Sequence, residues 1–312
     1  VDGLDDLYAD VPRSVIFDGD YDLPDAMSEM EVRRRFEELD RKNRHLTIMA
    51  GGGAYDHYAP AVVPALTSRS EYLTAYTPYQ AEISQGTLRY IFEFQSMIAT
   101  LTGMDCANAS MYDGATAAAE AMMMAMAATR KKTRVLLSST LLPQVREVVH
   151  TYAKYHGVEL SEIASADGQT DIDDVRRLLE TGDVAGVLVP SVNRFGIVED
   201  LSGFAEAAHA QKALLMVYAD PSALAVVRTP GEWGADVACG DAQTLGIPLG
   251  FGGPYVGFLA CSKEHVRKLP GRIVGATTDV DGKRAFVLTL QAREQHIRRE
   301  KASSNICSNQ AL

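Results

Sequence analysis

The sequence lacks most of the features that mark secreted, membrane-spanning and nucleic-acid-binding proteins. Its four cysteines, Cys106, Cys239, Cys261 and Cys307, are far apart and form no Cys-x-x-Cys pair. That pattern predicts free thiols in a reducing compartment, and therefore a cytoplasmic protein. No apolar run approaches the roughly 20 residues that a membrane-spanning helix needs, so no membrane association is expected. The formal net charge of −11, without a clustered basic stripe, argues against a nucleic-acid partner.

Familiar catalytic and metal-binding motifs are also missing. The chain has no Walker lysine, no His-Glu-x-x-His pair and no nucleophile elbow, and no metal site is expected. Its glycine-rich loop is not a dinucleotide fingerprint, because Gly250-x-Gly252-x-x is followed by Tyr255 rather than glycine. No lysine occurs between Lys212 and Lys263. A catalytic lysine is therefore absent from this entire part of the chain.

A glycine-rich loop stands at the centre of what is present. Residues 246–257 contain five glycines, between an apolar run that begins near Gly234 and another over residues 256–261. So many glycines are costly in backbone entropy unless a tight turn or a close approach requires them. The pattern places the loop at a site in the centre of an α/β domain.

Helical and strand patterns alternate along the rest of the chain. Helices are expected over residues 85–102, 114–129, 143–156, 172–180 and 204–211, and strands over 135–138, 158–163, 187–189, 214–218 and 256–261. The methionine-rich stretch of the second helix has no neighbouring cysteine or histidine, so it is interpreted as core packing. Continuously apolar strands predict a mostly parallel sheet covered on both faces. Ligands of such sheets gather beyond the carboxyl ends of the strands.

Three segments are expected. Residues 1–45 form an N-terminal arm with a helix, which begins with a capping box of Ser28 and Glu31. Residues 46–287 form the large domain, and residues 288–312 the start of a truncated small domain. Since the chain begins at Val1 and stops in an apparent helix start, we interpret it as a piece of a longer protein.

Four runs together resemble one family, the glycine cleavage system P-protein, also called glycine dehydrogenase (decarboxylating). These runs are YTPYQAEISQG at 76–86, MYDGATA at 111–117, GIPLGFGGP at 246–254 and RREKA at 298–302. The resemblance covers nearly the whole chain. It is strongest to the N-terminal half of the family, which some organisms make as a separate chain, subunit 1.

The resemblance implies a fold and an activity. The expected fold is the large domain of fold-type I transferases that depend on pyridoxal phosphate (PLP), with a mostly parallel seven-stranded sheet between helices. The implied reaction is the decarboxylation of glycine on PLP and transfer of the aminomethyl group to the lipoyl group of H-protein. The implied partner is a second subunit that carries the PLP-binding lysine. The implied assembly is a heterotetramer, with two copies of each subunit.

Residues of this chain depart from a complete PLP site. Asp220 lies where the family type places an acid against the pyridine nitrogen. Gln243, however, stands at the position of the Schiff-base lysine, and an amide nitrogen is not nucleophilic. Asp113 replaces a small hydroxyl residue at the start of the helix that would receive the phosphate. No residue of this chain is therefore expected to be catalytic, and the cofactor positions retained only as remnants are Asp113, Gly114, Ala115, Asn193, Asp220 and Gln243.

Two loops are expected to contribute to an interface or to a partner's active site. Their residues are Tyr76, Thr77, Tyr79, Gln80, Glu82, Ser84, Gln85, Gly252, Gly253 and Pro254. Simple interface packing is an equally good interpretation of Tyr76, Tyr79 and Glu82. Without the lysine, Asp220 is better interpreted as a retained structural acid than as a cofactor contact. Arg298 and Arg299 are interpreted as a solvated or ion-paired helix face. Three alternatives stay open: an independent PLP enzyme, a purely structural partner subunit, and a single-chain protein cut at Leu312.

Overall fold

The computed structural model describes residues 2–17, 19–44, 46–49, 51–73, 77–129, 131–291 and 297. The chain divides into two compact units, Val1–Met49 and Ala50–Leu312. Tyr76, Arg298, Arg299 and Cys307, which the sequence analysis singled out, lie outside the described residues. So does most of the segment expected to begin a small domain, and the domain boundaries stay a prediction.

Among the described residues of the first unit, α1 (Glu29–Asp40) is the one regular helix. It is preceded by η1 (Leu4–Tyr8) and η2 (Arg13–Val15). The backbone N–H of Ser28 donates to Glu31 Oε2 at 2.8 Å, and the Ser28 hydroxyl donates to the same oxygen at 2.7 Å. The predicted helix start is therefore confirmed, because the first of these bonds satisfies a backbone donor that has no partner within the helix.

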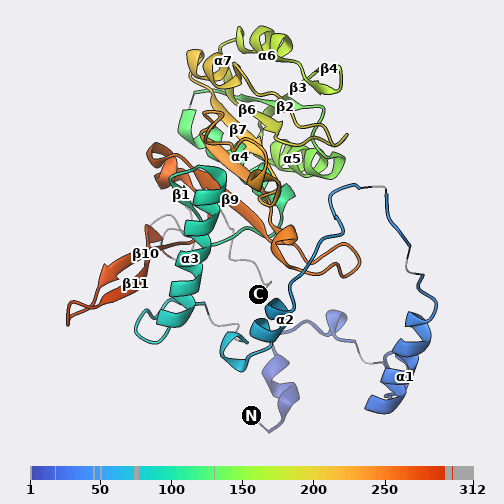
Figure 1. Cartoon of the computed structure of the whole chain (residues 1–312). Helices are drawn as coiled ribbons and strands as arrows, with labels where there is room; N and C mark the ends of the chain where they lie inside the picture. Colours follow the sequence, from blue (N-terminus) through green and yellow to red (C-terminus); the bar gives the residue numbers. More distant parts are fainter. Residues whose placement is uncertain are drawn as a thin grey trace. The chain divides into compact units, whose positions relative to one another are not determined.

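A seven-stranded sheet organises the second unit (Figure 1). Its strands are β1 (Cys106–Ala107), β2 (Arg134–Ser138), β3 (Glu159–Ile163), β6 (Val184–Pro190), β7 (Leu214–Tyr218), β8 (Val237–Asp241) and β9 (Gly257–Cys261). They lie in the order β1-β9-β8-β7-β6-β2-β3. The strands from β3 to β8 pair in parallel, whereas β9 is antiparallel to both β8 and β1. The predicted fold class, a mostly parallel seven-stranded sheet, is confirmed.

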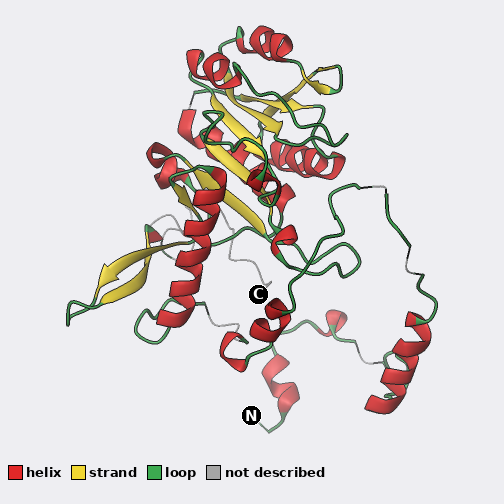
Figure 2. Ribbon diagram, viewed as in Figure 1, coloured by secondary structure: helices red, strands yellow, loops and turns green. Residues whose placement is uncertain are grey.

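Helices cover both faces of this sheet (Figure 2). They are α3 (Gln85–Thr102), α4 (Gly114–Thr129), α5 (Pro143–His156), α6 (Ile172–Leu179) and α7 (Phe204–Ala210). One core cluster joins α4 and α5 to the strands, and a second joins α3, α6 and α7 to the opposite face. Within β7 the side chains alternate, so that Met216 belongs to the first cluster and Val217 to the second. Burial on both sides explains why the strands read as continuous apolar runs.

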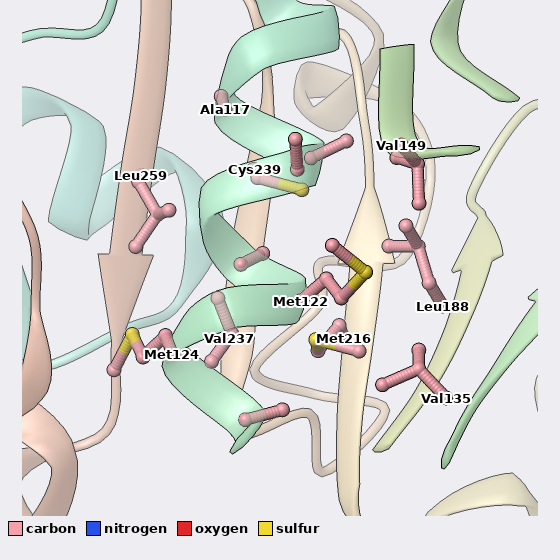
Figure 3. Packing of buried hydrophobic residues seen from close by; sticks show 14 of the residues in the cluster. Ala117, Met122, Met124, Val135, Val149, Leu188, Met216, Val237, Cys239 and Leu259 are labelled. Atoms are coloured by element: carbon pink, nitrogen blue, oxygen red, sulfur yellow. The ribbon is translucent and has the colours of Figure 1, made fainter. Parts of the chain in front are cut away.

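The helix α4 is buried along most of its length. Its Met122 and Met124 pack toward Leu188, Met216 and Val237 of the neighbouring strands (Figure 3). Both methionines are almost completely inaccessible to solvent. The interpretation of the methionine-rich run as core packing is therefore confirmed, since unbranched methionine side chains fill irregular gaps in a core.

A hairpin that the sequence analysis did not predict lies against α3. It consists of β10 (Ile273–Thr278) and β11 (Arg284–Thr289). Gln95 exchanges two hydrogen bonds with the backbone of Val274, at 3.0 and 2.9 Å, and Gln85 does the same with Phe286, at 2.8 and 2.9 Å. Each side-chain amide thus replaces a missing strand partner, which fixes the hairpin on the helix.

Short elements complete the described part of the chain. They are α2 (Val62–Thr67), the small pair β4 (Ser165–Ala166) and β5 (Gln169–Thr170), and the single turns η3 (Ser70–Tyr72), η4 (Ala223–Ala225), η5 (Gln243–Leu245) and η6 (Lys263–Lys268). Among the described residues, no helix combines the length and the apolar character that crossing a membrane demands.

Candidate functional site

The candidate site lies at the carboxyl edge of the central strands. Asp220 follows β7, Asp241 ends β8, and α4 begins at Gly114. Parallel strands bring their ends to one edge of the sheet, and β7 and β8 are parallel neighbours. The structure therefore assembles side chains that are more than 100 residues apart in the sequence.

Two carboxylates occupy the N-terminus of α4. Asp113 Oδ1 accepts a hydrogen bond of 2.7 Å from the N–H of Thr116, and Asp241 Oδ2 accepts one of 2.9 Å from the N–H of Gly114. Exposed N–H groups and the helix dipole make such a terminus attractive to an anion. The protein's own carboxylates therefore bind the donors that such a terminus offers to an anion.

The first residue of α4 has no room for a side chain. A Cβ on Gly114 would lie 2.5 Å from the Tyr218 hydroxyl oxygen and 2.9 Å from the backbone nitrogen of Asp241. Both distances are shorter than van der Waals contact allows. The absence of a side chain at Gly114 lets the helix start approach the ends of β7 and β8.

Burial and neighbouring charges raise the pKa values of Asp241 and Tyr218. Burial raises the pKa of Asp241 to about 6, and the nearby carboxylate of Asp113 adds to the effect, although hydrogen bonds from Gln243 and Gly114 oppose it. Burial likewise raises the pKa of the Tyr218 hydroxyl well above its usual value, with a further contribution from Asp241. The two groups share one poorly solvated environment.

This shift predicts a pH dependence of stability. Because the folded state raises the Asp241 pKa from 3.8 to about 6, it binds the proton more tightly than the unfolded chain does. The favourable contribution of Asp241 to the free energy of unfolding is complete below about pH 4 and is lost as the pH rises through about 6. The total loss is about 2 to 3 kcal/mol. Urea unfolding at several pH values should show this loss in the wild type relative to Asp241→Asn. Parallel stability profiles for the two proteins would contradict the assignment.

Gln243 is built into the glycine-rich loop. Its side-chain amide donates to the carbonyl oxygens of Gly252, at 2.9 Å, and Pro254, at 2.8 Å. Its backbone N–H donates to Asp241 Oδ1 at 2.9 Å. The residue is almost fully buried. At the position expected for a Schiff-base lysine, the chain therefore holds a neutral group that organises the loop.

Asp220 also bonds to its own surroundings. Its Oδ1 accepts hydrogen bonds from the N–H of Ser222 at 2.8 Å, from the Ser222 hydroxyl at 2.7 Å and from the Thr244 hydroxyl at 2.6 Å. The bond to Thr244 connects Asp220 to the turn that carries Gln243. The structure thus brings together Asp113, Gly114, Asp220 and Gln243, as the sequence analysis expected of neighbouring strand ends.

Asn193 does not contact this group through any hydrogen bond found in the described chain. Its amide donates to Glu199 Oε1 at 2.9 Å and to the carbonyl of Gly168 at 2.7 Å. Its Oδ1 accepts from the N–H groups of Phe195 and Ile197. These bonds hold the loop after β6 and give Asn193 a structural function.

The first of the two expected interface loops, which precedes α3, is held by Gln85 and Tyr79. Gln85 binds the β10–β11 hairpin, and the Tyr79 hydroxyl accepts a hydrogen bond of 2.8 Å from Arg272. Half of the Tyr79 side chain is nevertheless exposed, and Thr77, Gln80 and Glu82 are exposed or only partly buried. Ser84 is buried below them.

The tip of the glycine-rich loop presents an apolar side chain to solvent. Phe251 is fully exposed and has a φ of 59°, in the left-handed region that is unfavourable for a residue with a Cβ. Leu249 is also exposed. At the base of the loop, His57 Nε2 lies 2.8 Å from the carbonyl oxygen of Ile247. The loop therefore carries an exposed aromatic side chain on an unfavourable backbone conformation.

Two residues of the cluster received no role from the sequence. The sequence analysis assigns no function to Asp241 or Thr244, yet they bond to Gly114 and Asp220. Their spacing around Gln243 carried a usable signal, because residues of one turn after a strand face the same edge. The partners 24 and 127 positions away could not be read from local spacing.

Comparisons with known proteins find relatives over the whole length of this chain. A probable glycine dehydrogenase (decarboxylating) subunit 1 from Moorella thermoacetica is 55% identical over 309 residues, which cover 99% of this chain and 69% of the relative. The protein with the same description from Desulforamulus reducens is 54% identical, over 100% of this chain and 70% of that relative.

Solved structures give the same fold. A crystal structure of glycine decarboxylase (P-protein) of the glycine cleavage system, in inhibitor-bound form, superposes with a TM-score of 0.90 at 47% identity. It covers 99% of this chain and 69% of that one. A sphingosine-1-phosphate lyase from Burkholderia pseudomallei, 16% identical with a TM-score of 0.59, shares the fold alone over 88% of this chain and 67% of its own. The profile of the glycine cleavage system P-protein matches residues 1–312, and the chain belongs to that family.

Proposed function

We propose that this chain is the subunit of a glycine decarboxylase that does not itself bind PLP covalently. In this proposal a partner subunit supplies the PLP-binding lysine, and the heteromer decarboxylates glycine and passes the aminomethyl group to the lipoyl group of H-protein. The description "subunit 1" of its relatives implies such a partner. A heterotetramer and a cytoplasmic location belong to the same proposal.

The observation that carries the proposal is Gln243. A PLP enzyme of this fold needs a lysine amine to form a Schiff base with the cofactor, and an amide cannot replace it. The Gln243 amide is moreover engaged by two loop carbonyls, those of Gly252 and Pro254. PLP would contribute an electron sink to the reaction, and this chain provides no covalent attachment for it at that position.

The phosphate position gives an independent argument. Asp113 and Asp241 bring two carboxylates to the start of α4, and each already accepts a backbone N–H there. A phosphate dianion at that place would be repelled by Asp113 and would have to compete for the same donors. The residues present therefore do not fit PLP, and we assign no reaction step to this site.

The contribution of the chain to activity is then expected at its surface. Phe251 and Leu249 extend from a loop that Gln243 and His57 anchor, and Tyr79 and Glu82 are exposed on the loop before α3. In our proposal these loops cover the partner's active site and border the path of the lipoyl arm. They keep an apolar, water-excluding surface next to it.

Two other functions are weighed against this proposal. An independent aminotransferase or lyase is disfavoured by Gln243 and by the carboxylates at α4. A purely structural subunit is compatible with both observations. It predicts, however, that loop side chains are replaceable as long as the subunits assemble.

The experiment that separates these functions uses the complex reconstituted with its PLP-bearing partner. Tyr79→Phe, Glu82→Gln and Phe251→Ser are expected to lower the exchange of glycine carboxylate with carbon dioxide by about tenfold or more, a loss of about 1.4 kcal/mol in transition-state stabilisation. Tyr155→Phe and Glu147→Gln, on the exposed side of α5, serve as matched controls. Assembly is followed by size-exclusion chromatography. If the loop variants assemble and exchange glycine carboxylate at an unchanged rate, the proposal is contradicted and the chain is a purely structural subunit.

A further inference from the structure

A cluster of histidines and carboxylates lies at the edge of the sheet opposite the candidate site. Asp236 directly precedes β8, whereas Asp241 ends that strand. Around Asp236 stand His209 from the end of α7, and Glu264 and His265 from η6 after β9. The mechanism proposed above makes no use of these four residues.

The ligand atoms of Asp236, Glu264 and His265 are close to one another, and His209 lies against Asp236. His209 Nε2 lies 2.8 Å from Asp236 Oδ2, and His265 Nε2 lies 3.8 Å from Asp236 Oδ1 and 3.0 Å from Glu264 Oε1. One ligand atom each of Asp236, Glu264 and His265 falls within 4.8 Å of the others. Four ligands at about 2.0 to 2.2 Å from a tetrahedral ion lie about 3.4 Å from each other. The separations among Asp236, Glu264 and His265 bracket that value, so small side-chain movements would bring these three to one ion. His209 lies outside this group of three, and its side chain would have to turn toward the ion to become the fourth ligand.

The supporting structure orients the central ligand. Asp236 is buried, and its Oδ2 also accepts a hydrogen bond of 2.8 Å from the backbone N–H of Leu215. Its own backbone is held on both sides, since its N–H donates to Leu215 and its carbonyl accepts from Ser262. Such outer partners fix the orientation of metal-binding carboxylates. Glu264 and His209 are the exposed members and leave the cluster accessible from solvent.

We propose that His209, Asp236, Glu264 and His265 form a structural site for a divalent transition metal, with Zn²⁺ the best match. Two imidazoles and two carboxylates supply nitrogen and oxygen ligands that Zn²⁺ accepts, and the two carboxylates balance its charge. A bound ion would join α7, the start of β8 and η6 at one point. The sequence analysis expected no metal because the ligands come from three separate segments with no motif spacing.

Calorimetry with Zn²⁺ alone tests the site on chelator-treated, full-length subunit. We expect about one equivalent to bind and the unfolding midpoint to rise. His209→Asn, His265→Asn and Glu264→Gln should each weaken Zn²⁺ binding by at least about tenfold, the lower end of the loss seen for outer partners of metal sites. Glu264 is exposed, so its substitution leaves the fold intact, which circular dichroism checks. His150→Asn, an exposed histidine of α5, should change nothing.

Cobalt substitution identifies the ligands directly. Co²⁺ at this site should give visible absorption without a thiolate-to-metal charge-transfer band, and that absorption should disappear in His265→Asn. An undiminished Zn²⁺ affinity in His265→Asn and Glu264→Gln, or a charge-transfer band that identifies cysteine ligands, would overturn the proposal. Absence of Zn²⁺ binding to the wild type would overturn it as well. None of these outcomes depends on the PLP assignment, because the measurement needs no partner subunit or cofactor.

Discussion

Replacing Gly240 by alanine is expected to destabilise the protein by about 3 kcal/mol, at the upper end of the cost of overpacking a core. A Cβ at this position in β8 would lie 1.8 Å from the carbonyl oxygen of Ala219 and 3.0 Å from the ring of Phe258. The carbonyl belongs to backbone at the end of β7, so it cannot rotate away as a side chain does. The strands would have to separate where the site is formed.

The substitution should affect the site as well as the stability. Asp220 follows Ala219 directly, and Asp241 follows Gly240. Movement of these strand ends would disturb the bond from Gly114 to Asp241 and the bond from Thr244 to Asp220. Urea unfolding monitored by circular dichroism measures the change in free energy.

Gly86 provides the matched control for that substitution. It lies in the first turn of α3, and nothing stands within 4 Å of a Cβ built there. Gly86→Ala should therefore stabilise the protein by up to about 1 kcal/mol through helix propensity. A loss of less than 1 kcal/mol for Gly240→Ala would contradict the packing of the strand ends.

Replacing Glu199 by alanine is expected to cost about 4 kcal/mol. This carboxylate is almost completely buried. Its two oxygens accept from the Thr140 hydroxyl at 2.5 Å, the Asn193 amide at 2.9 Å, and the hydroxyl and N–H of Thr170 at 2.5 and 3.2 Å. Alanine would leave four buried donors without their acceptor, and each unsatisfied group costs about 1 to 3 kcal/mol before the structure relaxes.

Two comparison variants test the cause of that loss. Glu199→Gln keeps the shape and one acceptor oxygen, so it should cost less than half as much as alanine. Glu147→Ala removes an exposed carboxylate from α5 and should stay within about 0.5 kcal/mol of the wild type. Equal losses of unfolding free energy in the glutamine and alanine variants would contradict this account. They would show that unsatisfied donors do not cause the destabilisation.

The fold was largely predictable from the sequence because local patterns carry it. The helices α3, α4 and α5 begin and end where apolar periodicity, Pro143 and the glycines at 103 and 157 indicate. Six of the seven strands of the sheet were found from their apolar runs, whereas the two-residue strand β1 was not predicted. The β10–β11 hairpin was not predicted, because its sequence shows no clear alternation of apolar and polar residues. Its position also depends on Gln85 and Gln95, which belong to a helix distant in the sequence.

The site was predictable only in part. Gln243, Asp113 and Asp220 were identified through motifs, and the structure places them at one edge of the sheet. Asn193 was grouped with them because it also follows a strand. It bonds instead to Glu199, since the chain after β6 turns back on itself between Val192 and Val198. Such a turn depends on tertiary contacts and left no signal in the spacing.

The measurement that tests the central claim most directly is the visible absorption spectrum of the full-length subunit with PLP, followed by borohydride reduction and peptide mapping. The account predicts no protein-bound PLP chromophore and no reduced lysine adduct, because Gln243 stands at the lysine position. The partner subunit, treated in the same way, should give both signals and serves as the positive control. A stable chromophore with a single modified lysine in this chain would contradict the account and would make the chain a PLP enzyme in its own right.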